Sequence, residues 1–357
     1  MKILEDYYSL HQIPELDCHL PKTLAYITQA LSMLGCTLFS PSQGALCAFF
    51  DFGKEETLAF RADTDALPLQ EERHIPHRSR HDKKMHACGH DGHTAILLEL
   101  ARRISQKDTL PHNILLIFQP AEETDGGAKP ICQANVLQTY RVKAIFGLHL
   151  WPRLPAGKLF SKPGPLMCCG SGIHLTFYGK SEHIAHHRKR GDALAACCRF
   201  YTRAATIGKG DGQLVKFGRL QGGTAPNIIC DNAQLWGSVR AFQERHLLLL
   251  QKRLKGVCKA VSYATGCRGQ IDFSEGYPAV NNCPKLFAAA GQVCPCRTLA
   301  KGFMTTDDFG VYQQYVPGIY YLLGVGDTPP LHSSHFAFDP ALLEKGASFF
   351  EQIALTL

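Results

Sequence analysis

Short apolar runs that alternate with amphipathic stretches divide most of the chain into strands and helices. Continuous apolar runs predict buried strands at 45–52, 57–62, 113–118, 144–150 and 318–323. Apolar positions spaced three and four apart predict helices at 20–35, 94–105 and 284–293, and a last one from about Pro340. This alternation predicts an α/β fold in which helices cover both faces of a mixed sheet.

The pattern changes between residues 171 and 280. Strands are predicted at 173–178, 214–220, 234–242 and 270–273, with helices at 192–207 and 243–266. The resulting order, β-α-β-β-α-β, is that of a ferredoxin-like domain. Insertion of such a domain is physically easy because its two ends lie close together. We therefore expect a discontinuous first domain, residues 1–170 and 281–357, interrupted by an inserted domain at 171–280.

Composition indicates a globular protein of roughly two domains. The chain has 357 residues, of which 45% are hydrophobic and 19% charged. The net charge of +7 is mild and scattered, and its densest run, 186–190, is expected to be solvated surface. We therefore expect no nucleic-acid partner. No apolar run approaches the ~18 residues that a membrane helix needs, so no membrane association is expected.

The cysteines indicate a reducing compartment. There are 15, an odd number, and no secretory signal is apparent in the first residues. Neighbours such as Cys168 and Cys169 are poorly placed to bridge each other. We expect a cytoplasmic protein whose cysteines are mostly small buried hydrophobes.

The segment at 85–95, MHACGHDGHTA, places one thiol, three imidazoles and one carboxylate within eight residues. Cys and His are common metal ligands, and Gly89 and Gly92 permit the tight turn that would bring Cys88 and His90 together. The cluster is predicted to lie in a loop that ends at the N-terminus of the helix starting at Thr94. The alternative is a buried free cysteine among surface histidines.

Other polar residues follow the predicted strands of the first domain. In α/β sheets, ligands bind beyond the carboxyl ends of the strands. Adjacent glutamates there should point to opposite sides, so that one binds metal while the other stays free as a base. The residues at these ends are Asp63, Asp65, Glu122, Glu123 and His149. The two aspartates could equally be solvated turn residues.

Together with His332 from a late loop, these residues suggest a catalytic centre. One Cys, one Glu and three His are too many ligands for one tetrahedral ion but suit two ions that share a ligand. Such a centre polarises a carbonyl and lowers the pKa of bound water to about 7. A free carboxylate can then move the proton to a leaving amine. This chemistry predicts amide hydrolysis without a covalent intermediate.

Six motifs, in order, resemble the amidohydrolase branch of the aminoacylase/carboxypeptidase-type metallohydrolases. They are MHACGHDGHTA, FQPAEETDGGAKP, GLHLWP, GGTAPNII, MTTDDFG and LHSSHF, and the resemblance spans about residues 10 to 340. This branch includes hippurate hydrolases, indole-acetyl-amino-acid hydrolases and N-acetyldiaminopimelate deacetylases. The resemblance implies a two-metal catalytic domain and a smaller lid domain through which the protein forms a homodimer.

The resemblance also implies a role for each matching residue. The implied metal ligands are Cys88, His90, Glu123, His149 and His332. Glu122 would be the general base, Asp65 would orient the site, and His183 in the lid would steady the oxyanion in a neighbouring subunit. Asn227 and Arg240 would contact the substrate's carboxylate end. His86, His93 and His335 are expected to be structural or to support the site without binding metal. The chain departs from the usual pattern at Asp307, where glutamate is common.

These observations predict a cytosolic, metal-dependent amidohydrolase that acts on a small N-acyl amino acid. The tract AEETDGGAKPI is similar to the N-acetyldiaminopimelate deacetylases. Alternatives are a dipeptidase or carboxypeptidase of the same family, or a non-catalytic metal-dependent binding protein, against which an intact Glu122 argues. The cofactor is predicted to be two divalent ions, and the ligand set accepts Zn, Mn, Co or Ni.

Overall fold

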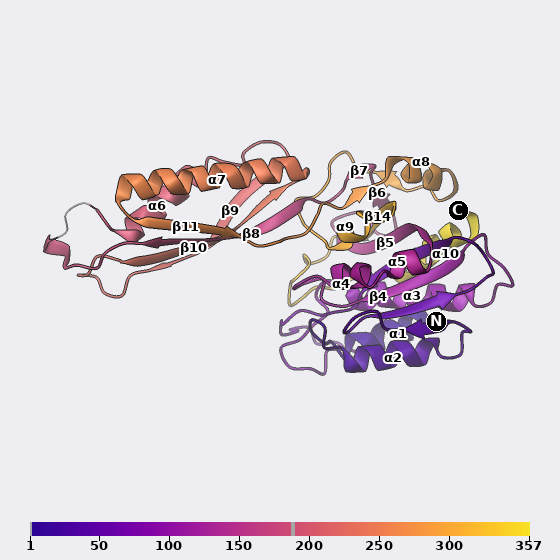
Figure 1. Cartoon of the computed structure of the whole chain (residues 1–357). Coiled ribbons are helices and arrows are strands. Elements are labelled where there is room, and N and C mark those ends of the chain that lie inside the picture. The colour runs from indigo at the N-terminus through magenta and orange to yellow at the C-terminus, as the bar shows by residue number, and fades with distance from the viewer. Residues whose placement is uncertain (1, 187–189) are drawn as a thin grey trace. The chain divides into compact units, whose positions relative to one another are not determined.

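A computed structural model describes residues 2–186 and 190–357 (Figure 1). Residues 187–189 of the basic run at 186–190 lie outside the described residues. The chain forms two compact units. Unit 1 comprises Met1–Leu166, Val280–Lys301 and Asp308–Leu357, and unit 2 comprises Met167–Ala279 and Gly302–Asp307. Unit 2 therefore interrupts the sequence of unit 1.

Unit 1 is built on an eight-stranded mixed sheet. Its strands, in spatial order, are β1 (Thr37–Phe39), β2 (Leu46–Phe50), β4 (Asn113–Gln119), β3 (Thr57–Asp63), β5 (Val142–Pro152), β14 (Gly318–Gly326), β6 (Leu159–Ser161) and β13 (Arg297–Thr298). The central strands β4, β3, β5 and β14 run parallel to one another. Their residues are almost entirely buried, which explains the continuous apolar runs in the sequence. A two-stranded ribbon joins β7 (Gly164–Pro165) to β12 (Asn281–Asn282).

Helices lie on both faces of this sheet. One face packs against α1 (Lys2–His11), α2 (Pro21–Leu31), α3 (His90–Ile104), α8 (Pro284–Val293) and α10 (Leu343–Thr356), and these form the main apolar core. The short helices are α4 (Ala128–Gln133), α5 (Val136–Thr139), α9 (Phe309–Tyr312) and the 3-10 turn η2 (Pro340–Leu342). Phe309 of α9 packs on Tyr320 of β14, whose neighbours Ile319 and Tyr321 face the main core, so α9 covers the opposite face.

The sheet opens at the carboxyl ends of its central strands. β3 pairs with β4 as far as Asp63 and Gln119, but with β5 only as far as Arg61 and Gly147. Beyond Arg61, β3 therefore stays hydrogen-bonded to β4 but is no longer paired with β5. The opening lies at the edge where the sequence places its candidate site residues.

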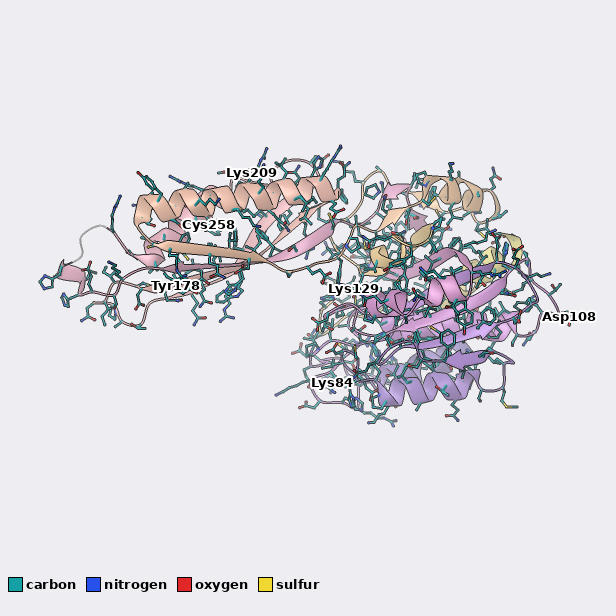
Figure 2. All side chains as sticks on the ribbon, in the orientation of Figure 1. Lys84, Asp108, Lys129, Tyr178, Lys209 and Cys258 are labelled. Carbon is teal, nitrogen blue, oxygen red and sulfur yellow. The ribbon has the colours of Figure 1, made fainter. Side chains whose placement is uncertain are left out.

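Unit 2 has the predicted β-α-β-β-α-β order. Its elements are β8 (Cys169–Tyr178), the 3-10 turn η1 (Ile184–His186), α6 (Ala193–Ala204), β9 (Gln213–Gly222), β10 (Asn232–Ala241), α7 (Glu244–Thr265) and β11 (Arg268–Phe273). The sheet order is β11-β8-β10-β9, with antiparallel pairing throughout. Figure 2 shows Cys258 on the side of α7, whereas Tyr178 lies on the opposite side of the sheet.

Two sequence expectations about these units were wrong. The helix predicted to start at Thr94 begins at His90, because the two glycines do not prolong the loop as we expected. The positive charge is not scattered. Unit 2 contains 16 Lys and Arg residues against 8 Asp and Glu, whereas unit 1 contains 22 against 23.

Two further expectations concern disulfide bonds and membrane-spanning helices. All 15 cysteines are free thiols, which confirms that the chain is not a disulfide scaffold. Among the described residues, no helix has both the length and the apolar character that crossing a membrane requires.

Candidate metal centre

The first turn of α3 presents the histidines of the central motif. Gly89 precedes the helix with φ of 87°, a left-handed conformation that favours glycine. Gly92 lies within the helix and serves close packing, because a Cβ there would stand 2.8 Å from Leu150. His90 and His93 therefore project from a helix N-terminus and not from a loop.

One ring nitrogen of His90 is hydrogen-bonded, and the other has no hydrogen-bond partner among the described residues. Its Nδ1 donates to the carbonyl oxygen of Asp65 at 2.9 Å, so Nε2 is the nitrogen left to bind a metal ion, which would displace its proton. That Nε2 is buried and has no hydrogen-bond partner in the described part of the chain. It lies 3.5 Å from Asp63 Oδ2 and 3.9 Å from Glu123 Oε1. Burial alone would lower the pKa of His90, but Asp63, Asp65 and Glu123 raise it to about 10, so the surroundings favour a cation at this point.

The turn after β4 places both glutamates at the same site. Ala121 adopts a left-handed φ of 57°, and the carboxylate of Asp65 then accepts the backbone N–H groups of Glu122 and Glu123, each at 3.1 Å. One carboxylate oxygen of each glutamate lies within 4.8 Å of a ring nitrogen of His90. Our expectation that the two would point to opposite sides was wrong, because they follow the strand in a turn and not in an extended segment.

Cys88 and His149 face each other. His149 donates from Nδ1 to the carbonyl of Leu150 at 2.7 Å, so the lone pair on its Nε2 faces Cys88 Sγ at 3.5 Å. Burial, together with Glu123 and Glu122, raises the pKa of the Cys88 thiol well above its usual value. Burial, assisted by His93, holds the pKa of His149 well below its usual value. In the absence of metal the pair is therefore a thiol donating to a neutral imidazole.

His332 reaches the site from the C-terminal segment. Its backbone is left-handed, with φ of 64°, and its N–H donates to the carbonyl of Ala87 at 2.9 Å. Its Nε2 lies 3.1 Å from Glu123 Oε1. The side chain is 53% exposed, whereas those of His90 and Glu123 are 1% and 11% exposed, so His332 marks the solvent side of the cluster.

The structure thus brings together the five residues for which the resemblance implied metal binding. Cys88 Sγ is the donor that joins them, because it lies within 4.8 Å of Glu123 and His332 and 3.5 Å from His149. Separations of 3.1–3.9 Å match the roughly 3.3–3.8 Å between neighbouring ligands of a tetrahedral ion with bonds of about 2.0–2.3 Å. The open Nε2 of His90 and the mixed sulfur, nitrogen and oxygen set fit divalent transition-metal ions.

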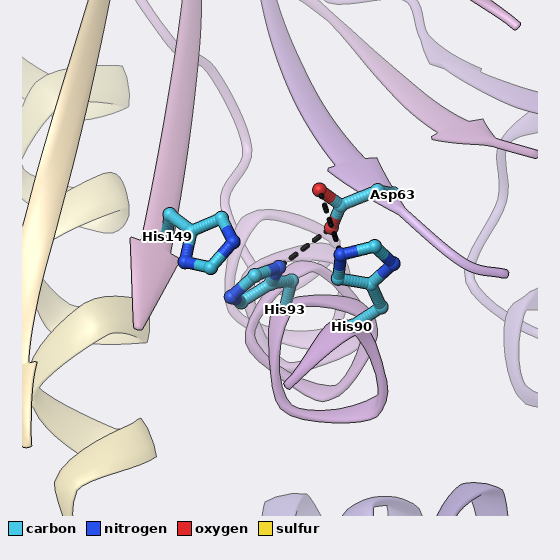
Figure 3. A group of neighbouring side chains, drawn as sticks. All are labelled: Asp63, His90, His93 and His149. Atoms are coloured by element: carbon cyan, nitrogen blue, oxygen red, sulfur yellow. Dashed lines mark hydrogen bonds and ion pairs between the residues drawn. The ribbon is translucent and has the colours of Figure 1, made fainter. Parts of the chain in front are cut away.

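A second buried group, Asp63, His90, His93 and His149, has the proximity of a metal site but different bonding (Figure 3). His93 accepts a hydrogen bond from Leu150 N–H at 2.9 Å and donates to Asp63 Oδ1 at 2.6 Å. Asp63 Oδ2 accepts from Arg61 at 2.8 Å. Both nitrogens of His93 are therefore already used, which agrees with the expectation that His93 supports the site without binding metal.

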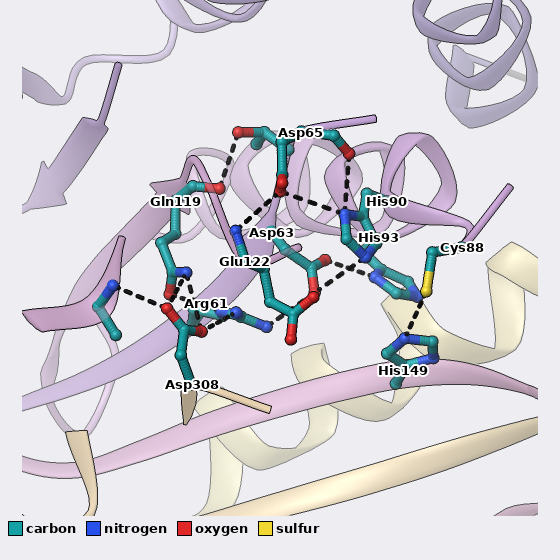
Figure 4. Close-up of polar contacts among 12 residues, drawn as sticks. Arg61, Asp63, Asp65, Cys88, His90, His93, Gln119, Glu122, His149 and Asp308 are labelled. Carbon is teal, nitrogen blue, oxygen red and sulfur yellow. Dashed lines mark hydrogen bonds and ion pairs between the residues drawn. The ribbon is translucent and has the colours of Figure 1, made fainter. Parts of the chain in front are cut away.

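Arg61 anchors a buried network behind this group (Figure 4). It donates to Asp63 and Asp308, both at 2.8 Å, and to Gln119 at 2.9 Å. Asp308 also accepts from Gln119 and from Ala128 N–H. Asp308 belongs to the MTTDDFG motif, but the sequence alone does not reveal these contacts, because the partners Gln119 and Arg61 lie about 190 and 250 positions earlier.

A further buried network joins α1 to α3. His11 Nδ1 lies 2.5 Å from Asp91, the residue after His90, and its Nε2 lies 3.3 Å from Glu71. Arg73 is 3.0 Å from the same Nε2 and opposes protonation of the ring, but two carboxylates outweigh one guanidinium. Burial alone would lower the pKa of His11, whereas Asp91 and Glu71 raise it to about 9.

The three candidate residues of unit 2 fall into two places. His183 and Asn227 lie on neighbouring segments. His183 forms an isolated antiparallel β-bridge with Ile228, and the N–H of Ile184 donates to the carbonyl oxygen of Asn227 at 3.1 Å. Both His183 and Asn227 are exposed. Arg240 lies near the far end of β10, where it donates to the carbonyl of Met304 at 2.6 Å. Asn227 precedes the start of β10, so Arg240 is separated from the other two by most of a strand.

A sequence profile of peptidase family M20/M25/M40 matches residues 59–356, most of the chain. The chain belongs to this family. An N-acetyldiaminopimelate deacetylase of Shouchella clausii is 35% identical over 338 residues, covering 91% of this chain and 90% of the relative. An uncharacterized hydrolase of Staphylococcus haemolyticus is 32% identical, covering 97% and 95%. The resemblance inferred from the six motifs is thereby confirmed.

Two solved structures are similar to this chain over nearly its full length. A putative aminohydrolase from methicillin-resistant Staphylococcus aureus has a TM-score of 0.91 at 27% identity, covering 99% of this chain and 95% of its own. The Bacillus subtilis protein YXEP, described as a dinuclear metal binding peptidase from the M20 family, has a TM-score of 0.88 at 28% identity, covering 100% and 98%. Membership in the M20 family supports a hydrolytic enzyme, and the buried donor cluster supports metal ions as its cofactor.

Proposed function

We propose that this M20 hydrolase is a metal-dependent amidohydrolase that removes the acyl group from an N-acyl amino acid. The observation that carries the proposal is the convergence of Cys88, His90, Glu123, His149 and His332, with the Glu122 carboxylate beside His90 and Glu123. A site for storing metal needs ligands alone, whereas a hydrolase also needs a base within reach of a water.

The five ligands would hold two divalent ions. Bound there, the ions would polarise an amide carbonyl and lower the pKa of a water to about 7. Glu122 would accept the proton of that water and return it to the nitrogen of the leaving amine. Asp65 holds the backbone of both glutamates, so it would set the base and one ligand at a fixed spacing.

Unit 2 would serve as the lid and dimerisation domain, residues 171–280 by sequence. Its substrate-contacting residues are separated within the unit, because β10 runs roughly 27 Å between Asn232 and Arg240 at about 3.4 Å per residue. We therefore assign Arg240 to the substrate carboxylate in one protomer. His183, with Asn227 next to it, would act in the site of the second protomer of a homodimer.

The proposed substrate is N-acetyldiaminopimelate. The deacetylase of Shouchella clausii supports this choice by its identity and coverage, and the tract around Glu122 and Glu123 is the part of the sequence that suggested it. A panel should therefore release acetate from N-acetyldiaminopimelate much faster than benzoate from hippurate or amino acids from simple dipeptides. A reversed order would reject the substrate while leaving the amidohydrolase assignment intact.

The proposal is tested with Glu122→Gln, which keeps the shape of the side chain and removes its basicity. Loss of a general base should lower kcat about 10²- to 10⁴-fold, while metal content after dialysis should stay at the wild-type value. Thr124→Val, on the same turn but exposed, is the matched control and should keep normal activity. Metal-loaded wild-type protein without hydrolysis of any N-acyl amino acid or dipeptide would favour a binding protein.

A further inference from the structure

The hydrogen bonding between β3 and β5 ends just before the metal centre. β3 pairs with β5 only as far as Arg61 and Gly147. The N–H of Leu150 therefore lies on a part of β5 that has no β3 carbonyl opposite it. It donates instead to Nε2 of His93, 2.9 Å away. A side chain from α3 thus takes the place of a backbone acceptor at the point where the sheet opens.

The remaining contacts of His93 fix which of its nitrogens carries hydrogen. Because Nε2 accepts from Leu150, the hydrogen of the ring must be on Nδ1, which donates to Asp63 Oδ1 at 2.6 Å. Asp63 is held in turn by Arg61 at 2.8 Å. Figure 3 shows His93 between Asp63 and His149. With Arg61, Asp63 and His93 all at most 2% exposed, water does not compete for these bonds.

His93 contacts His149, a proposed metal ligand, through both its backbone and its ring. The N–H of Leu150 belongs to the peptide bond that follows His149, so this hydrogen bond fixes the backbone from which the His149 ring projects. The two rings are also in edge-to-face contact, with centroids 4.5 Å apart at 62°. The carbonyl of Leu150 then accepts from His149 Nδ1, which aims Nε2 at Cys88.

We infer that His93 is a positioning residue for His149, holding its backbone and ring so that one of the two metal ions binds tightly. The inference rests on the proposed function in that it assumes a centre of two ions. It assigns His93 no contact with metal, because neither of its nitrogens is available. It also distinguishes the two ions, because His90, Glu123 and His332 are held by other contacts.

The test compares three variants. His93→Leu removes both hydrogen bonds at similar volume, and His93→Gln keeps an amide that can replace one of them. His86→Leu is the matched control, because His86 is equally buried, belongs to the same motif, and has no hydrogen-bond partner for either ring nitrogen among the described residues. Metal-free proteins are titrated with Zn²⁺ and Co²⁺ by calorimetry and absorbance, and the melting temperature of each is recorded.

In His93→Leu, one of two dissociation constants should rise about 10- to 100-fold, the range for partners that orient metal ligands, and the other should change less than threefold. His93→Gln should recover part of the loss, and His86→Leu should bind both ions as the wild type does. Equal weakening of both ions, or the same weakening in His86→Leu, would show that only packing was lost and would overturn the inference.

A separate measurement covers the case in which His93→Leu does not fold. In the metal-free wild type, the nitrogen spectrum of the imidazoles should show His93 as the Nδ1–H tautomer. The Nε2–H form would overturn the inference. Wild-type protein that binds no divalent ion would instead refute the proposed function, so the two failures are distinct.

Discussion

Replacing Asp65 by asparagine tests whether one carboxylate sets both the base and a metal ligand. Each of its oxygens accepts one backbone N–H, from Glu122 and from Glu123, at 3.1 Å. Asparagine keeps one oxygen acceptor but turns an amide N–H toward the second donor. One charge-assisted hydrogen bond is lost, and such bonds contribute about 1.5–3 kcal/mol.

If that hydrogen bond stabilises the reactive positions of Glu122 and Glu123, its loss should lower kcat/KM about 10- to 150-fold, since about 1.4 kcal/mol corresponds to a factor of ten. The assay is initial-rate hydrolysis of an N-acyl amino acid at saturating metal, with metal affinity measured in parallel. Asp17→Asn is the control. Asp17 also accepts a hydrogen bond from the turn that carries Glu122 and Glu123, but from the hydroxyl of Thr124 and at an exposed position. Activity of Asp65→Asn within threefold of the wild type would refute the orienting role of the carboxylate.

Of the other three predictions, two rest on buried contacts and one on the exposed His183. The imidazolium of His11 is favoured by the fold, so its stabilisation is fully present below pH 6.5 and disappears as the pH rises through about 9. The unfolding free energy should fall by up to about 3 kcal/mol more in the wild type than in His11→Gln across that range, and parallel curves in denaturant titrations would contradict this. Arg61→Met should destabilise unit 1 by about 3–5 kcal/mol, because two buried carboxylates lose their guanidinium; a change below about 1 kcal/mol would show that the network is relieved in another way. Mixed dimers of Glu122→Gln with His183→Ala should regain activity that neither variant has alone, whereas no recovery would exclude action of His183 across the subunit interface.

The sequence predicted the five long strands of the sheet and indicated part of the candidate metal centre, because each has a local signal, whereas the short strands β1, β6 and β13 were missed. Buried parallel strands are continuous apolar runs, and a thiol two residues from an imidazole is a rare pattern. The start of α3 at His90 was missed, because two glycines usually indicate a loop. Gly92 is there for a tertiary reason, the approach of Leu150, which no local pattern reveals.

The contacts of Asp63 and His93 were also beyond sequence reasoning, although His93 was expected not to bind metal. Asp63 and Asp65 are separated by one residue and have the same chemistry, yet one supports an imidazole and the other two backbone amides. Which nitrogen of His93 carries hydrogen depends on Leu150, 57 positions later. The concentration of positive charge in unit 2, by contrast, could have been found from the sequence, because the expected domain at 171–280 already contains the same 16 Lys and Arg residues.

The parallel pairing of β5 with β14 has a consequence for biosynthesis. β5 ends at Pro152 and β14 begins at Gly318, so about 165 residues are translated before β5 acquires this neighbour. At about 5–20 residues per second, a ribosome needs roughly 10–30 s for that length. During that interval a strand of high apolar content has one uncovered edge, which is a template for aggregation. Chaperone protection of the nascent chain therefore matters most during this interval, which ends only when β14 emerges.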